Sequence, residues 1–243
     1  MFIGAPDPFG PVDLVPDPPT GFTAYERANL SGATDTFSVT QAEFQGVRFG
    51  FARAFDLAYG EGSGRFDRAI CVFGVPTVLA DIFPRAGEDY SDIAFLGFAT
   101  RVDSTTGEIL QRFDLSSSIL SFSADVDDQD VVTISVSPRG REILADGSLS
   151  ATVFEFEDLV TQSSKIRFGP DGATGFDDPN AEAAQFEGEL TAPGAMTSFS
   201  LMSGWFFGPQ AEEAGFTFFV EYVDDQSGGD DRLILNGLGL AKQ

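Results

Sequence analysis

The sequence predicts an all-β protein, and its composition and patterning both point there. Among 243 residues there are 26 phenylalanines and 27 glycines. Aromatic side chains suit the half-buried surface of a pleated sheet, and glycine suits the tight links between strands. Signals for helices are few, whereas short stretches of alternating apolar and polar residues recur along the chain. A chain of this length can bury a sizeable core, as one large domain or two small ones.

A proline-rich stretch opens the chain. Residues 1–21 contain Pro6, Pro8, Pro11, Pro16, Pro18 and Pro19. Because proline fixes its own φ angle and donates no backbone hydrogen bond, we expect an extended lead without a core of its own. Such a lead is either a spacer or an arm laid along a sheet.

Ordered strands are expected to start near Phe22. The turn at Gln45 and Gly46 and the glycine-rich run at 60–64 separate apolar stretches of strand length. The expected strands span residues 37–44, 47–59 and 65–73. Residues 22–73 are therefore predicted to form a small N-terminal sheet.

The remainder, residues 74–243, has the pattern of a meander of short strands. Leu120, Phe122 and Ala124, for example, alternate with serines, which places one face in a core and one in water. Further strands are expected at residues 93–101, 132–136, 148–156, 166–168, 186–190, 198–207, 215–222 and 233–238. About eight such strands fit an antiparallel up-and-down β-barrel, because closure removes the sheet edges that promote aggregation. A sandwich of the same strands is the alternative.

The most distinctive stretch is SGWFFGPQAEEAGFTFF, at residues 203–219. Its first aromatic residues predict a strand, which Gly208 and Pro209 end. Residues 210–214 are predicted to form one helical turn, with Glu213 either near the positive end of the helix dipole or bonded to nearby backbone amides. Gly215 then releases the chain into a second strand.

This corner resembles the closing motif of the β-barrel of bacterial transferrin-binding protein B. The matching positions are Gly204, Phe206, Phe207, Gly208, Pro209, Ala211, Glu213, Gly215 and Phe218. Residues 74–99 are similar to that family's entry into the barrel, with a Gly-x-Pro-Thr, a Pro-x-x-Gly and a tyrosine that opens a strand. Phe216 replaces a usual second glycine, and residues 89–92 are more acidic than the pattern. The resemblance implies an eight-stranded up-and-down barrel over residues 74–243, preceded by a handle-like sheet.

The charge of the chain narrows its partners and its location. Lys and Arg number 14 against 38 Asp and Glu, which gives a formal net charge of −24. Because this charge repels phosphate backbones and anionic bilayers, we expect no nucleic-acid partner and a soluble monomer. The first residues show no signal-peptide pattern, and no stretch approaches the ~18 apolar residues of a membrane helix. The expected location is the extracellular space or the outer-membrane surface.

Most catalytic machinery is missing from the sequence. The chain has no histidine and one cysteine, which excludes Ser-His-Asp and Cys-His catalysis, histidine-ligated zinc or haem, and iron–sulfur clusters. It also lacks the Gly-rich loops that bind nucleotides. Cys71 lies in an apolar run and is expected in the core. Glu187 and Glu189 share a strand face, as paired catalytic carboxylates do, but solvated strand faces give the same pattern, so we expect no enzyme.

Two ligands, haem and calcium, fit the residues that remain. Tyrosine can ligate haem iron, and Tyr90 is the first choice because it falls in the segment that should enter the barrel. Tyr59, beside the glycine-rich turn, and Met202 are further candidates, although packing in a barrel wall explains such residues equally well. Calcium would find carboxylate oxygens in an acidic turn that hairpin formation also explains. Its candidate ligands are Asp224, Asp225, Asp230 and Asp231.

Two functions from different classes follow. The resemblance implies a non-enzymatic secreted or surface-exposed binding protein. Such a protein captures an iron source, either haem or an iron-carrier protein, or another solute, and passes it to an outer-membrane transporter. The alternative is a structural or adhesive surface protein that uses the same barrel without a small ligand, with which the acidic composition agrees.

Overall fold

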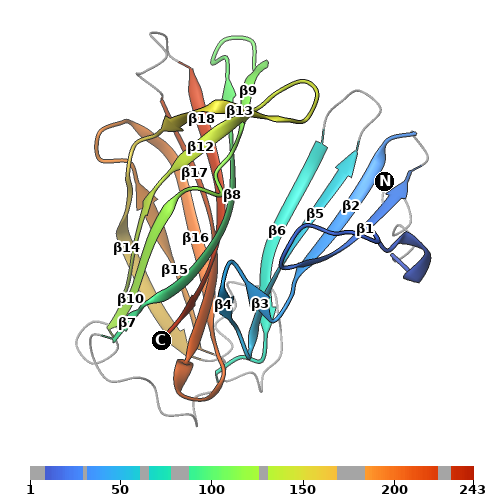
Figure 1. The fold of residues 1–243 in the computed structure, drawn as a ribbon. Helices are drawn as coiled ribbons and strands as arrows, with labels where there is room; N and C mark the ends of the chain where they lie inside the picture. Colours follow the sequence, from blue (N-terminus) through green and yellow to red (C-terminus); the bar gives the residue numbers. More distant parts are fainter. Residues whose placement is uncertain are drawn as a thin grey trace, which may run out of the picture.

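The computed structural model describes residues 9–29, 32–60, 66–77, 88–125, 131–168, 184–223 and 231–243. The described chain is all-β, as the composition predicts. Its strands form three antiparallel sheets, and the helical elements in these ranges are two short 3-10 turns, η1 (Pro11–Asp13) and η2 (Pro209–Ala211). Figure 1 shows a small sheet beside a much larger, curled one. Neither of these turns has the length or the apolar character needed to cross a membrane.

The small N-terminal sheet contains four strands in the order β1-β2-β5-β6. They are β1 (Phe22–Ala28), β2 (Thr34–Thr40), β5 (Ala52–Gly60) and β6 (Phe66–Gly74), each antiparallel to its neighbours. The described part of the proline-rich lead is an arm along this sheet. Leu14 forms a bridge with Tyr25, and the Val15 amide donates to the Ala24 carbonyl oxygen at 2.9 Å.

A separate hairpin interrupts strands that the sequence predicted as continuous. β3 (Glu43–Phe44) pairs with β4 (Val47–Arg48), and the turn between them has positive φ angles at Gln45 (51°) and Gly46 (82°). Two positive φ angles are typical of a type I′ turn, whose twist matches a two-residue hairpin. The predicted turn is confirmed, but it belongs to a hairpin of its own. The Gln45 side-chain amide exchanges two hydrogen bonds with the backbone of Phe95 in the large sheet (2.7 and 2.9 Å).

The large sheet has twelve antiparallel strands in the order β13-β12-β9-β8-β18-β17-β16-β15-β14-β11-β10-β7. The strands are β7 (Glu88–Tyr90), β8 (Asp92–Val102), β9 (Ile109–Asp114), β10 (Ile119–Asp125), β11 (Val131–Ser137), β12 (Arg139–Ile143), β13 (Leu149–Glu155), β14 (Leu159–Phe168), β15 (Ala184–Thr191), β16 (Thr197–Phe207), β17 (Glu213–Val223) and β18 (Arg232–Lys242). Figure 1 shows the sheet curling back on itself, and the larger hydrophobic core lies inside the curl.

The strand number differs from the eight expected. β9, β12 and β13 extend the sheet beyond β8, and β7 is a short strand of its own that pairs with β10. Ser91 alone separates β7 from β8, so one nearly continuous stretch of chain contributes to the sheet next to β10 and again next to β18. The structure therefore establishes a large curled antiparallel sheet with additional strands at one side.

Phenylalanine and glycine fill the inside of the curl together. Phe113, Phe122, Phe186, Phe206 and Phe216 are all buried to 2% exposure or less. These rings lie against the backbone of neighbouring strands and leave no space there for a side chain, so glycine occupies those positions. A Cβ atom on Gly237 would lie 2.2 Å from the ring of Phe218, and one on Gly239 would lie 2.5 Å from the ring of Phe216. The abundance of both residue types thus has one packing explanation.

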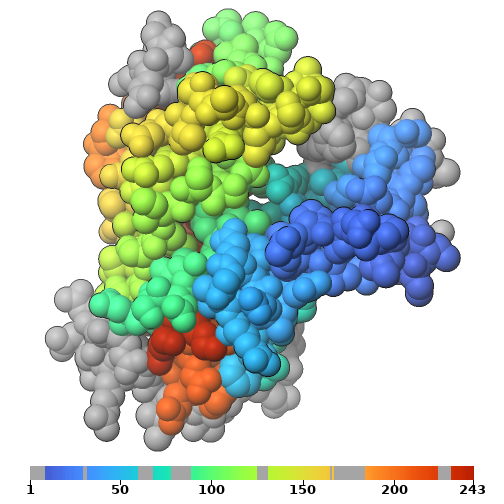
Figure 2. Space-filling view, in the orientation of Figure 1, coloured from blue at the N-terminus to red at the C-terminus, as the bar shows by residue number. Residues whose placement is uncertain are grey.

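A second core joins the two sheets. Ala52, Ala54 and Val72 of the small sheet pack with Leu238 and Leu240 on the outside of the large sheet. The small residues on β5 let the sheets approach closely, so the contact excludes water along the lower part of the interface. The space-filling view shows the two parts touching there, with a hollow between them higher up (Figure 2).

Candidate functional site

The junction between the two sheets contains a buried carboxylate, that of Glu213. The side chain is 1% exposed, and its oxygens accept hydrogen bonds from the backbone amides of Gly50 (2.5 Å), Phe51 (2.9 Å) and Ala52 (2.7 Å). The ammonium of Lys242 lies 4.0 Å away. Because three amides point at one charged group, the carboxylate fixes the start of β5 against the end of the corner.

The predicted helical turn at this corner is wrong in form. η2 covers Pro209 to Ala211, and Gln210 (59°) and Ala211 (55°) both have positive φ, so the turn is left-handed. Glu213 is the first residue of β17 and not part of a helix start. Its amide partners lie more than 160 residues earlier in the chain, and are not the nearby amides that the sequence suggested.

The glycines of the motif allow close packing at the corner. A Cβ on Gly208, whose φ is 76°, would lie 2.4 Å from the ring of Phe51, and one on Gly204 would lie 2.3 Å from the ring of Phe186. A Cβ on Gly215 would lie 3.1 Å from its nearest neighbours, and Phe206 is fully buried. Pro209 opens the turn. These fold-motif residues therefore hold a shape and present no reactive group.

The two sequence motifs that carry the family resemblance meet in the structure. The Thr77 hydroxyl donates to the Gly208 carbonyl oxygen (2.6 Å), and the Thr77 amide donates to that of Phe206 (2.8 Å). The Gly208 amide donates in turn to the carbonyl oxygen of Val75 (2.9 Å). The segment after β6 is thus tied to the turn that precedes β17.

The haem candidates do not share a site. Tyr90 lies in β7 rather than in a loop, is 3% exposed, and donates its hydroxyl to the carbonyl oxygen of Ala211 (2.7 Å). Met202 is fully buried in the core of the large sheet. Tyr59 is half-buried on β5 of the small sheet. Their positions explain Tyr90 and Met202 as packing residues, and the prediction that any of the three binds a ligand stays a prediction.

The calcium candidates fall mostly outside the described residues. Asp224, Asp225 and Asp230 lie there, and Asp231 is half-buried just before β18. In the part of the chain that the structure describes, no three acidic or cysteine side chains gather in a way that would hold a metal ion.

Cys71 differs from its expected place in the core. It is exposed on β6 and forms no disulfide. Val72, the next residue, is the one that faces the large sheet, because neighbouring residues of a strand point to opposite faces. Neighbouring atoms still cover part of the sulfur, and this burial raises the pKa of the Cys71 thiol above its ordinary value.

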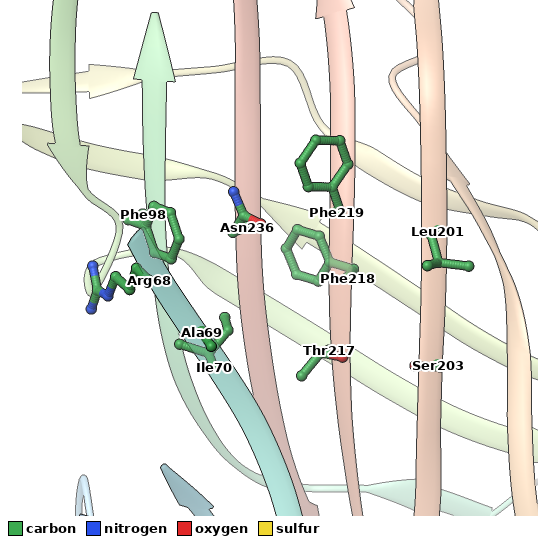
Figure 3. Close-up of a pocket in the computed structure, with 10 residues that line it drawn as sticks. All are labelled: Arg68, Ala69, Ile70, Phe98, Leu201, Ser203, Thr217, Phe218, Phe219 and Asn236. Carbon is green, nitrogen blue, oxygen red and sulfur yellow. The ribbon is translucent and has the colours of Figure 1, made fainter. Parts of the chain in front are cut away.

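A groove lies where β6 leaves the wall of the large sheet. Its volume is about 210 Å³. The wall carries the aromatic rings of Phe98 and Phe219 and the side chain of Leu201, which is 53% exposed. Figure 3 shows these side chains on β8, β17 and β16, with β6 running diagonally past Phe98 and below Phe219 and Leu201. Sequence reasoning missed this site, because each strand contributes only one or two outward residues that look like any others.

Arg68 lies at one end of the groove and is already neutralised. Its guanidinium forms two hydrogen bonds with the carboxylate of Asp56 (2.5 and 2.8 Å) and stands 4.4 Å above the ring of Phe98. A bidentate pair and a ring contact hold the arginine against the wall. The groove therefore offers apolar contact surface and backbone groups, with little charge of its own.

The chain was compared with family models, curated proteins and solved structures. No protein-family model matches the chain, and no curated protein matches it. The structure is similar to that of a mutant of the vaccine antigen Transferrin Binding Protein B from Haemophilus parasuis, with 13% sequence identity and a TM-score of 0.45. The match covers 92% of this chain but 38% of that one, so the chain spans well under half the length of that protein.

Proposed function

We propose that this chain is a non-enzymatic binding module that holds a partner protein in the groove between β6 and the outer wall of the large sheet. In this proposal the large sheet closes as an eight-stranded barrel through β7 and β8, and the barrel is the scaffold. The groove residues Leu201 and Phe219 carry the contact. The single observation behind the proposal is an exposed apolar wall beside a fixed junction.

The shape of the groove favours a protein segment over an enclosed small molecule. Small-molecule pockets typically have volumes of about 300–1,000 Å³ and bury most of their ligand, whereas this groove has about 210 Å³ and is open along one side. Outside the groove, Phe199 is 55% exposed, and the centroid of its ring lies 5.5 Å from that of Phe219. The apolar surface thus continues past the groove, as at a protein interface.

Among the ligands that the sequence motifs imply, we propose an iron-carrier protein as the partner. An iron-carrier protein presented at the cell surface or in the extracellular space fits the proposal better than haem, because Tyr90 and Met202 are buried and the hydroxyl of Tyr90 has a backbone partner. Transfer to an outer-membrane transporter would be the following step. The missing histidine and the lack of a nucleophile–base pair in the sequence support a role without catalysis.

The test compares wall variants with a matched surface variant. Leu201→Ser and Phe219→Ser remove apolar surface from the groove wall. Ile119→Ser removes a similar side chain that is 57% exposed on β10. Each protein is immobilised and exposed to serum or spent growth medium, and any stoichiometric partner is then titrated.

We expect both wall variants to weaken binding at least about tenfold, and the Ile119 variant to bind as the native chain does. The proposal fails if no stoichiometric partner is recovered, or if all three variants bind it equally. A shifted Soret band on adding haemin, lost in Tyr90→Phe, would instead support haem capture.

A further inference from the structure

The two outer edges of the small sheet differ. The edge of β1 is covered by the chain's own lead, through the bridge of Leu14 with Tyr25 and the hydrogen bond of Val15 with Ala24. β6 forms the opposite edge, and no strand among the described residues pairs with its outer side. Proteins usually shorten, cover or charge such edges because an open edge recruits another strand. A nine-residue edge strand that no described strand pairs with on its outer side, beside an apolar wall, is therefore a docking feature.

The pairing with β5 shows which backbone groups point outward. The Val75 amide donates to Phe51 across the pair, and antiparallel strands alternate between bonded and non-bonded residue pairs. Counting back along β6, the backbone groups of Ala69 and Cys71 face β5, whereas those of Arg68 and Ile70 face the open edge. On β5, the amide of Ala54 donates away from β6, to the hydroxyl of Thr40 at 2.9 Å, as this alternation requires.

The open edge and the groove are the same place. Ala69 and Ile70 point to opposite faces of the sheet, yet both line the groove. A groove that residues of both faces line must run along the edge of the strand, where the backbone of β6 is exposed. The opposite side of the groove is the wall of Phe98, Leu201 and Phe219 (Figure 3).

The charge of this protein determines whether an acidic or a basic partner segment can bind along the edge of β6. Asp56 neutralises Arg68, which is the cation of the groove lining, through two hydrogen bonds. The chain as a whole carries 38 acidic against 14 basic residues. An acidic segment would meet repulsion without compensation, whereas lysine or arginine residues beside the bound segment would be attracted.

We propose that the edge of β6 binds an extended, cationic segment of the partner protein as an added strand. Its backbone bonds to the outward groups of Arg68 and Ile70, and its apolar side chains at alternate positions contact the wall. The inference rests on the proposed function and adds the form and charge of the recognised segment.

The experiment selects peptides and then breaks the backbone contact. A display library of random twelve-residue peptides is selected on the immobilised full chain, and the enriched peptide is synthesised. Its affinity is measured by calorimetry for the native chain, for Ile70→Pro, which lacks the outward amide, and for Ile70→Ala, which keeps it. Thermal melting checks that each variant folds.

We expect enriched peptides with alternating apolar residues and lysine or arginine. Loss of the amide in Ile70→Pro should weaken binding at least about tenfold, and Ile70→Ala should weaken it less than about threefold. If Ile70→Pro does not fold, the native chain is titrated with the peptide N-methylated at every second residue, in either register. One register should abolish binding and the other preserve it.

Equal binding of the two N-methylated peptides, or of the two Ile70 variants, overturns the added-strand inference. Enrichment of acidic peptides, or of none, overturns it as well. If the wall variants Leu201→Ser and Phe219→Ser lose the partner while Ile70→Pro keeps it, the proposed function stands and only the added strand fails. Self-association of the native chain in sedimentation would identify a second copy as the occupant and also contradict it.

Discussion

Glu213 shows how much one buried side chain determines in this protein. Its carboxylate is the acceptor for three consecutive backbone amides of the N-terminal part. It thereby joins this part to the large sheet, together with the apolar second core and the two hydrogen bonds between Gln45 and Phe95. A buried charge is tolerated because every hydrogen bond it needs is present. The residue is a positioning group for the start of β5.

Replacing Glu213 with alanine should lower the free energy of unfolding by about 3–5 kcal/mol, because three buried amides lose their acceptor. Glu213→Gln keeps one acceptor oxygen and should cost about 1–3 kcal/mol. Urea denaturation measures both. The neighbour Glu212 is exposed, and Glu212→Gln is the control, with an expected change below about 0.5 kcal/mol. A loss in the control as large as in Glu213→Gln would contradict the role.

Cys71 gives a second prediction at the residue scale. Because its side chain is exposed, native protein should react with a disulfide reagent such as DTNB without unfolding. The thiolate is the reacting form, and the pKa of this thiol is raised by partial burial. The labelling rate should therefore be low near neutral pH and still be increasing at about pH 9. A native rate far below that of urea-unfolded protein at high pH would restore the core interpretation.

At the scale of elements, the corner between β16 and β17 is held by Thr77, which precedes the large sheet, and by Tyr90 in β7, the first strand of that sheet along the chain. Thr77 bonds to Gly208 on one side of the turn, and Tyr90 bonds to Ala211 on the other. A turn with two non-glycine residues at positive φ is costly by itself, so these bonds stabilise it.

Tyr90→Phe tests this support and the haem hypothesis together. It removes the hydroxyl that donates to the carbonyl oxygen of Ala211. That oxygen keeps the Gln243 side-chain amide as a donor at 3.1 Å, so the free energy of unfolding should fall by about 1 kcal/mol. Guanidinium denaturation gives the value. A haemin titration of the same variant should match that of the native chain. A Soret shift that haemin gives with the native chain and that is lost in the variant would make Tyr90 a ligand.

The glycines of β18 make a prediction about the inside of the curl. In Gly237→Ala the new methyl group would lie 2.2 Å from the ring of Phe218, so the ring must shift, at a cost of about 1–3 kcal/mol. Gly10→Ala is the control, because its nearest neighbour would be 3.9 Å away. Thermal unfolding measures the loss of stability in both variants, and only Gly237→Ala should melt at a lower temperature than the native chain. Equal melting temperatures would mean that the interior has room to spare.

Not all elements could be predicted from the sequence. Strands with one buried and one wet face, such as β10 and β11, show the alternation and were predicted correctly. β9 and β12 were missed. Each has a single buried residue, Phe113 in β9 and Gly140 in β12, and the others are half-buried or exposed. A strand that is held mainly by backbone pairing leaves no periodic signal.

For the whole molecule, the net charge of −24 should make stability depend on salt. Like charges on one compact body repel each other, and the screening length falls from ~30 Å at 0.01 M salt to ~8 Å at 0.15 M. The melting temperature should therefore increase by about 5 °C over this range. Scanning calorimetry in sodium chloride and in choline chloride, both with chelator, measures it.

The control separates screening from specific binding. If the acidic turn near Asp231 binds calcium, micromolar calcium should raise the melting temperature far more than the same ionic strength of sodium. A calcium effect of less than ~1 °C would exclude a site that matters for stability. A melting temperature that falls with sodium chloride would contradict the repulsion argument.

The sequence by itself determined the all-β class, most of the strand positions and the residues of the corner motif, because these depend on local periodicity and turn chemistry. The tertiary structure alone decided that Glu213 bonds to Gly50, Phe51 and Ala52, that the motif at residues 74–77 meets the corner, and that β6 has an open edge beside an aromatic wall. Those contacts join residues far apart in the chain, and a contact of that kind imposes no pattern on neighbouring positions.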